Sequence, residues 1–165
     1  MGIVKERFKE KSDAANIEIK NLLKEHGNKV IGEVTLSQIY QGMRGMTGLV
    51  TETSLLDAQE GIRFRGFSIP ELQQKLPKAN GGAEPLPEGL FYLMLIGELP
   101  TMDDVNHITN VWQRRSHVPS HVFSAIDSLP LYAHPMTMFV IGVMALQTEG
   151  HFVKEYSNGI NKKDY

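Results

Sequence analysis

The sequence predicts a mainly α-helical protein with a small β element between residues 30 and 66. Outside that stretch, apolar residues recur at helical spacing, and proline or glycine closes each run. Inside it, short β-prone pieces alternate with glycines and acids that favour turns. With 165 residues, of which 22% are charged, the chain is expected to fold as one domain.

An amphipathic helix is predicted at the N-terminus. Val4, Phe8 and Leu22 belong to an apolar series with steps of three, four and seven residues. Gly27 follows where such a helix would end. The remaining positions are rich in Lys and Glu, which is typical of a solvated face, and no function is assigned to them.

Short strands are predicted within the β element at residues 30–31, 49–50, 54–56 and 62–64, with a brief helix at 36–41. Ile62 and Phe64 share one side of the last strand, which is the period of two of a half-buried strand. Arg63 and Arg65 take the other side, and the pattern alone leaves open whether they bind an anion or belong to the scaffold. Gly66 then permits a turn.

The second half of the chain is predicted to be helical. Ser68 and Glu71 form a capping box for one helix, and Pro70 fits its first turn. A surface loop over residues 77–87 follows, with three prolines and a glycine pair. Further helices are expected from Pro87, Thr101 and Ser120, and over residues 134–148 and the stretch after 150.

The helix at residues 134–148 is apolar nearly all round, so it is expected to be buried on several sides. No segment after it offers the packing partners that this burial requires. We therefore expect the end of this chain to be a cut end.

Composition and charge argue against several classes of function. The net charge of −2 lacks the basic excess of a nucleic-acid-binding surface. Zero cysteines exclude disulfides, a thiol nucleophile and thiolate metal sites, and leave the compartment open. The N-terminus does not resemble a signal peptide, and the longest apolar run falls short of the roughly 20 residues of a membrane span.

The histidines do not form a recognisable metal site. Six are scattered over different predicted elements, and none has the His-Glu-x-x-His spacing. His117 and His121 are four apart, but Pro119 starts a new helix between them and removes the shared face. No metal ligand and no catalytic residue is assigned.

One loop carries the candidate binding residue. Gly42, Gly45 and Gly48 recur every three residues in QGMRGMTGL, a pattern that fits tight turns rather than a dinucleotide fingerprint or phosphate loop. Arg44 lies among them, where its guanidinium is able to form a bidentate contact with a phosphate. A surface arginine without a partner is the competing interpretation.

The stretch YQGMRGMTGLVTETSLLDAQEGIRFRGFSIPELQQKLPKANGGAEPLPEGLFYLMLIGELPT closely resembles citrate synthases of the form found in mitochondria and some bacteria. The resemblance continues through VPSHV and HPMTMFVIGVMALQTEG, so it covers nearly the whole chain from about Gly27. It implies that residues 1–165 are the N-terminal part of the multi-helical large domain of that fold, without its small domain and catalytic segments.

The resemblance also implies a function. Members are mostly homodimers that condense acetyl-CoA with oxaloacetate to citrate and CoA in the tricarboxylic acid cycle, an acyltransferase reaction. Acetyl-CoA is a substrate there, and no prosthetic group is expected. The family's catalytic groups lie in later segments, so this chain alone is expected to be inactive. The helix at 134–148 resembles one that packs across the dimer interface. Arg63 and Arg65 resemble scaffold residues of the family, so they are expected to pair with nearby acids rather than to hold a ligand.

Arg44 is similar to the arginine of the family's GGMRG motif, which is associated with binding a CoA phosphate; Gln41 replaces the first glycine here. Two alternatives to a citrate synthase portion stay open: a fragment of a 2-methylcitrate synthase, and a non-enzymatic helical self-association module. Bacterial cytoplasm is the expected compartment, with the mitochondrial matrix as the alternative.

Overall fold

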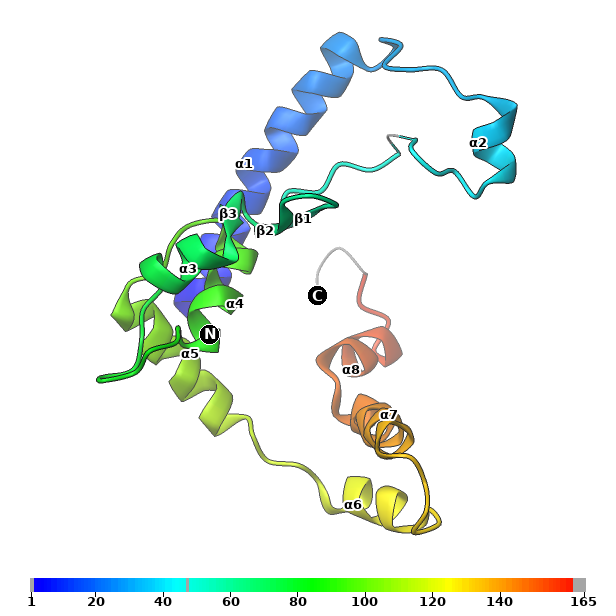
Figure 1. The fold of residues 1–165 in the computed structure, drawn as a ribbon. Coiled ribbons are helices and arrows are strands. Elements are labelled where there is room, and N and C mark those ends of the chain that lie inside the picture. Colours follow the sequence, from blue (N-terminus) through cyan, green and yellow to red (C-terminus); the bar gives the residue numbers. More distant parts are fainter. Residues whose placement is uncertain (1, 47, 162–165) are drawn as a thin grey trace. The chain divides into compact units, whose positions relative to one another are not determined.

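The computed structural model describes residues 2–46 and 48–161 (Figure 1). Within them lie eight α-helices, one short 3₁₀-helix and a small three-stranded sheet, which confirms the predicted fold class. The chain divides into two compact units, Met1–Gln113 and Arg114–Tyr165.

The first unit begins with the long helix α1 (Gly2–His26), as predicted. It ends at Gly27, where a Cβ would overlap the carbonyl oxygen of Leu23, so the position favours glycine. Val4 is its buried residue and packs with Tyr92, Ile96 and Ile108. The helix is thus fixed to the unit near its N-terminal end.

The β element is smaller than predicted. The brief helix α2 (Leu36–Tyr40) is present, and strands β1 (Ser54–Asp57), β2 (Gly61–Phe64) and β3 (Phe67–Ser68) form an antiparallel sheet in the order β1-β2-β3. The strands predicted at 30–31 and 49–50 were wrong, because a β-prone dipeptide without a neighbouring strand in the described chain gains no ladder hydrogen bonds. The two-residue strand β3 was missed.

Three helices supply most of the core of the first unit: α3 (Ile69–Lys75), α4 (Pro87–Ile96) and α5 (Met102–Arg114). The capping box of Ser68 and Glu71 is present at the start of α3, as predicted. Leu72, Leu76 and Leu93 form one buried cluster, and Phe64 and Phe67 of the sheet pack against it. The sheet is therefore seated on α3 and α4.

The second unit contains α6 (Ser120–Asp127), α7 (Pro135–Leu146), a 3₁₀-helix (Gln147–Glu149) and α8 (His151–Ser157). Helices α6 and α7 pack together at Gly142. A Cβ at Gly142 would lie 3.1 Å from Cδ1 of Ile126 and 3.8 Å from Cγ1 of Val122. The absence of a side chain at this position lets the two helices approach closely.

Helix α7 differs from its prediction in burial. The sequence predicts burial on several sides, yet Gly142 is its only buried residue, and Phe139 and Met144 are 63% and 67% exposed. The reason is that α6 covers one side of α7 and most of the remaining apolar surface is left uncovered. Among the described residues, no single helix has the length and apolar character to cross a membrane; the bent pair Pro135–Glu149 and His151–Ser157 meets those two criteria only when taken together.

Candidate functional site

The loop after α2 carries Arg44, the candidate binding residue. A capping box of Thr35 and Gln38 starts α2, so the short helix is well defined locally. The chain then turns back: the N–H of Met43 donates to the carbonyl of Gln38 at 2.8 Å, and that of Met46 to the carbonyl of Met43 at 3.2 Å. These bonds close a tight turn that contains Arg44, which is exposed.

The turn uses left-handed backbone at three positions, with φ of 72° at Gly42, 62° at Met43 and 73° at Gly45. No atom lies within 4 Å of a Cβ built on either of these glycines, so conformation and not space favours glycine. The predicted tight turns are thereby confirmed at Gly42 and Gly45. Met43 adopts the same region at a cost of about 1–2 kcal/mol.

Arg44 is exposed, and it makes no hydrogen bond or ion pair with the residues that the structure describes. Beside its turn is an open hollow of about 310 Å³, lined by Ile31, Gly32, Glu33, Val34, Gln38, Gly45 and Met46. The carboxylate of Glu33 disfavours an anion inside the hollow itself.

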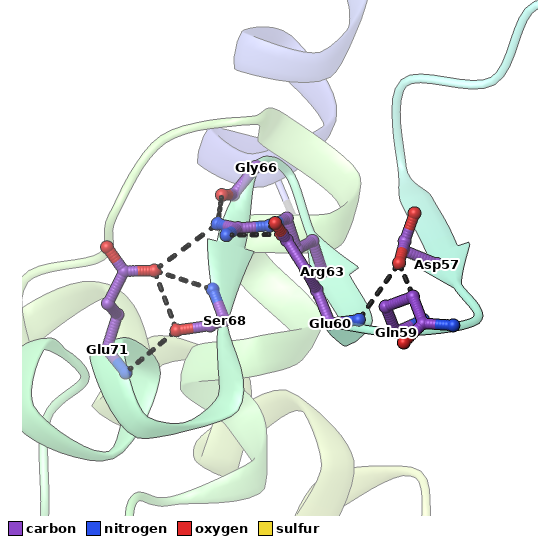
Figure 2. A network of polar contacts seen from close by, with 7 residues as sticks. All are labelled: Asp57, Gln59, Glu60, Arg63, Gly66, Ser68 and Glu71. Atoms are coloured by element: carbon purple, nitrogen blue, oxygen red, sulfur yellow. Dashed lines mark hydrogen bonds and ion pairs between the residues drawn. The ribbon is translucent and has the colours of Figure 1, made fainter.

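Arg63 belongs to a scaffold network, as predicted. Figure 2 shows its guanidinium between two acids: Nη2 lies 3.0 Å from Oε2 of Glu60, and Nη1 lies 3.8 Å from Oε2 of Glu71. Nη1 also donates to the carbonyl of Gly66 at 3.1 Å. With both acids and a carbonyl as partners, Arg63 ties the hairpin to the start of α3.

Two carboxylates of the same network are held in their charged form. The backbone N–H groups of Glu60 and Gln59 donate to Asp57 and lower its pKa (Figure 2). The backbone N–H and then the hydroxyl of Ser68 do the same for the pKa of Glu71. Lowered pKa values make both groups weak bases, which fits structural roles.

Arg65 was predicted to share a strand face with Arg63, but it lies in the turn after β2, with a φ of 48°. Its Nε and Nη2 donate to the carbonyl of Met94 at 3.2 and 2.8 Å. Its Nη1 lies 3.7 Å from Oε2 of Glu52, so the predicted pairing with an acid is confirmed. The contact with α4 was missed, because its 29-residue separation leaves no local signal.

A second polar cluster, also missed from the sequence, fastens α1. Arg7 pairs with Asp104 at 2.8 Å and donates to the hydroxyl of Tyr92, and Lys11 pairs with Glu98. Partial burial tends to raise the pKa of Asp104, but bonds from Thr101 and then Arg7 outweigh it, and the pKa is lowered. Asp104 thus caps α5 together with Thr101, as a first-turn acid is expected to do.

The histidines for which contacts are seen act within the scaffold. His134 caps α7, since its Nδ1 accepts from the N–H of Met136 at 3.1 Å. His121 Nε2 lies 3.2 Å from the carbonyl oxygen of Ala145 near the end of α7. In the described part of the chain, no group of three or more His, Cys, Asp or Glu side chains is arranged to hold a metal ion.

Comparison with known proteins gives the family. A family model described as "Citrate synthase, C-terminal domain" matches residues 42–165, which include the Arg44 turn, the hairpin and all later helices. The chain belongs to the citrate synthase family. This confirms the family resemblance seen in the sequence, while the assignment of residues 1–165 to the N-terminal part of the large domain stays a prediction.

Individual relatives in the citrate synthase family are similar over nearly the whole chain. "Citrate synthase, mitochondrial" of Aspergillus niger and of Saccharomyces cerevisiae are each 54% identical over 162 residues, 98% of this chain and 34% of the relative. "2-methylcitrate synthase, mitochondrial" of Yarrowia lipolytica is 53% identical over 162 residues, 98% of this chain and 35% of the relative. The chain thus spans about a third of the length of these curated relatives.

Proposed function

We propose that this chain is the N-terminal framework portion of a citrate synthase, the acyltransferase that condenses acetyl-CoA with oxaloacetate and water to give citrate and CoA. The observation that carries the proposal is the 54% identity over 162 residues to two relatives named citrate synthase. The family match over residues 42–165 supports it.

The isolated chain does not catalyse the condensation under this proposal. The reaction needs a positioned base that removes a proton next to the thioester, and a donor that stabilises the enolate oxygen. The structured acids Asp57 and Glu71 are weak bases that accept hydrogen bonds from the backbone. No catalytic residue is assigned to this chain, and the reactive groups come from other segments of the longer protein.

Arg44 contributes to binding the substrate, by contacting a phosphate of acetyl-CoA. Its exposure on a left-handed turn and its lack of an acidic partner in the described chain support this role. A guanidinium with no internal partner keeps its donors for a bidentate contact with phosphate. Under this proposal, acetyl-CoA and oxaloacetate are substrates of the whole enzyme, and the reaction uses no metal or prosthetic group.

Helix α7 contributes to a homodimer interface. Its exposed large apolar side chains are Met136, Phe139, Val140, Val143, Met144 and Leu146. A single apolar helix leaves this much surface uncovered only at a cost in free energy, because such surface is favourably removed from water. The symmetric pairing usual in homo-oligomers would cover the same patch on both copies.

The decisive experiment is a chimera. The 162-residue segment of the Saccharomyces cerevisiae relative that this chain matches is replaced by the chain, and CoA release is measured with acetyl-CoA and oxaloacetate. The chimera is expected to form citrate, and the 165-residue chain alone is expected to release no CoA. A folded, dimeric but inactive chimera would instead favour the non-enzymatic self-association module; activity of the chain alone would refute its inactivity.

A second candidate function is supported by the Yarrowia lipolytica relative, which is named a 2-methylcitrate synthase and is 53% identical. The same chimera is also assayed with propionyl-CoA in place of acetyl-CoA, and the two values of kcat/KM are compared. A higher kcat/KM for propionyl-CoA than in the unmodified relative would favour the second candidate.

The proposed compartment is the mitochondrial matrix. The three relatives described above are all named as mitochondrial proteins, which favours this alternative over the bacterial cytoplasm that the sequence led us to expect. Immunofluorescence in the source cells, with an antibody against residues 87–113, is expected to coincide with a matrix marker. Diffuse staining would contradict the proposal.

A further inference from the structure

The turn between β2 and β3 places an arginine where the backbone favours other residues. Arg65 and Gly66 have φ of 48° and 85°, and the pair Phe64↔Phe67 flanks them, so they are the two central residues of a tight hairpin turn. Asn, Asp and Gly are preferred at such positive-φ positions. The left-handed conformation of Arg65 costs about 1 kcal/mol or more, which indicates that contacts made by its side chain compensate for the strain.

The first contact of the Arg65 side chain is with the C-terminal turn of α4. The guanidinium of Arg65 donates through two nitrogens, Nε and Nη2, to the carbonyl oxygen of Met94, one of the last-turn carbonyls that a helix cannot satisfy itself. The helix ends at Gly97 with a left-handed φ of 84°, and a Cβ there would lie 3.7 Å from Cζ of Arg65. The guanidinium therefore packs closely against the end of α4, and the Arg65 side chain is only 20% exposed.

Arg65 also contacts the segment that follows the Arg44 turn. The backbone N–H of Arg65 donates to the carbonyl of Thr53 at 2.9 Å, and Nη1 lies 3.7 Å from the carboxylate of Glu52. These two residues form the stem between the Arg44 turn and β1. Residues 27–45 are exposed almost throughout, whereas Thr51, Glu52 and Thr53 contact the sheet or its turn, Thr51 by donating from its hydroxyl to the carbonyl of Ser54 at 2.8 Å.

We propose that Arg65 is a positioning residue that fixes the direction of the Arg44 turn, and this inference rests on the proposed function of Arg44. Most of this link comes from the hydrogen bonds that the guanidinium donates to Met94 and that the backbone N–H of Arg65 donates to Thr53. The pair with Glu52 adds little, because that carboxylate is 81% exposed and exposed ion pairs contribute about 0–1 kcal/mol. Through this arrangement, the end of α4 sets where the guanidinium of Arg44 meets a phosphate.

The absence of cysteine allows a direct test on the 165-residue chain. The Leu49→Cys variant, at an exposed position on the stem side of the turn, carries a nitroxide spin label. Arg65→Asn keeps a residue that tolerates positive φ but removes the guanidinium. The label is expected to become more mobile in Arg65→Asn and to stay nearly unchanged in the matched control Glu52→Gln, because the exposed pair between Glu52 and Arg65 adds little. Unchanged mobility in Arg65→Asn would overturn the proposal.

Hydrogen exchange gives a second readout of the same link. Amides of residues 54–57 in Arg65→Asn are expected to exchange about fivefold faster, the factor that corresponds to the loss of roughly one hydrogen bond. Arg65→Lys keeps the charge without the planar fork and is expected to give intermediate exchange, so it replaces Arg65→Asn if circular dichroism shows that the latter is unfolded. Exchange in Arg65→Lys equal to the parent would count against the proposal.

The chimera separates this inference from the proposed function. There, Arg65→Asn is expected to raise KM for acetyl-CoA about threefold with kcat little changed, because a misplaced binding group weakens binding without touching the reacting atoms. If Arg44→Ala leaves KM unchanged while Arg65→Asn still makes the spin label more mobile, the phosphate role of Arg44 fails and the structural link between Arg65 and the turn stands. If KM responds to Arg44→Ala but neither label nor KM to Arg65→Asn, the positioning role fails alone.

Discussion

Arg7 on α1 lies 2.8 Å from the carboxylate of Asp104 on α5, and the same guanidinium nitrogen donates to the hydroxyl of Tyr92 on α4. One cation therefore joins three helices of the first unit. The bond that Arg7 donates to the Tyr92 hydroxyl, and then its interaction with the Asp104 carboxylate, raise the pKa of Arg7, so its charged form is favoured in the fold. This contact, together with the packing of Val4 in the buried cluster with Tyr92 and Ile108, fixes α1 to the other helices.

Asp104→Ala is expected to destabilise the first unit by about 1–2 kcal/mol, because it removes both the capping box with Thr101 and the pair with Arg7. Urea unfolding followed by circular dichroism measures the change. Asp103→Ala is the matched control: it lies one residue earlier in the same turn, and a change within about 0.5 kcal/mol is expected. Equal effects of the two variants would show that the contact contributes nothing.

The stability of the fold is expected to fall at acidic pH. Asp57, Glu71 and Asp104 all have pKa values below their ordinary 3.8, 4.5 and 3.8. A lowered folded-state pKa means that the stabilisation is complete above the unfolded value and is lost as the pH falls through the folded value. Urea midpoints are expected to be level from pH 7 to about pH 5 and to decline below about pH 4.5. An Asp104→Asn variant should decline less steeply; an identical slope would contradict the assignment.

Gly142 provides a test of helix packing in the second unit. In Gly142→Ala, a gain of about 1 kcal/mol in helix propensity offsets a tight contact with the mobile end of Ile126, so little change is expected. Gly142→Leu forces α6 and α7 apart and should cost about 1–3 kcal/mol. Thermal unfolding of both variants checks this. Equal melting temperatures for the two would mean that the helices do not cross closely at this position.

Self-association is expected to depend on α7. Phe139→Asp places a charge in the exposed apolar face and should shift a dimer toward monomer in sedimentation velocity. Leu131→Asp is the control, since Leu131 is fully exposed and precedes α7 in the chain. A parent chain that stays monomeric at high concentration would exclude α7 as a sufficient interface for this portion.

Arg44→Ala in the chimera is expected to raise KM for acetyl-CoA roughly tenfold and to leave kcat unchanged, because a charge-assisted contact to a phosphate is lost while the reacting atoms are untouched. Steady-state kinetics at several salt concentrations check this, and the difference between parent and variant should shrink as salt screens the contact. A KM that is unaffected at low salt would contradict the phosphate role.

The elements predictable from the sequence were those with local causes. The end of α1 at Gly27, the capping box of Ser68 and Glu71 and the turn at Gly66 each follow from residues within four positions of one another. The strands predicted at 30–31 and 49–50 failed because strand formation depends on a distant partner as well as on local preference. Arg65 shows the same limit, since its role depends on Met94, 29 residues away.

The candidate site was predictable only in part for a related reason. Glycines spaced by three residues indicate tight turns, and the left-handed backbone at Gly42 and Gly45 agrees with that prediction. The sequence carries no information on the hollow beside the turn or on Glu33 at its wall, because both depend on how the chain returns after α2. The apolar character of α7 was evident from the sequence, but its exposure follows from the small size of α6 beside it.

The attachment of α1 by its first three turns has a consequence for how that helix comes apart. Every residue from Asp13 to His26 is exposed, so this half receives no help from tertiary contacts and relies on intrinsic helix propensity, which is marginal in water for segments of this length. Its far end should therefore fray long before the rest of the unit unfolds. A gradient of melting temperatures along one continuous helix would be visible to site-specific infrared labels, with the lowest values around Leu22 and Leu23.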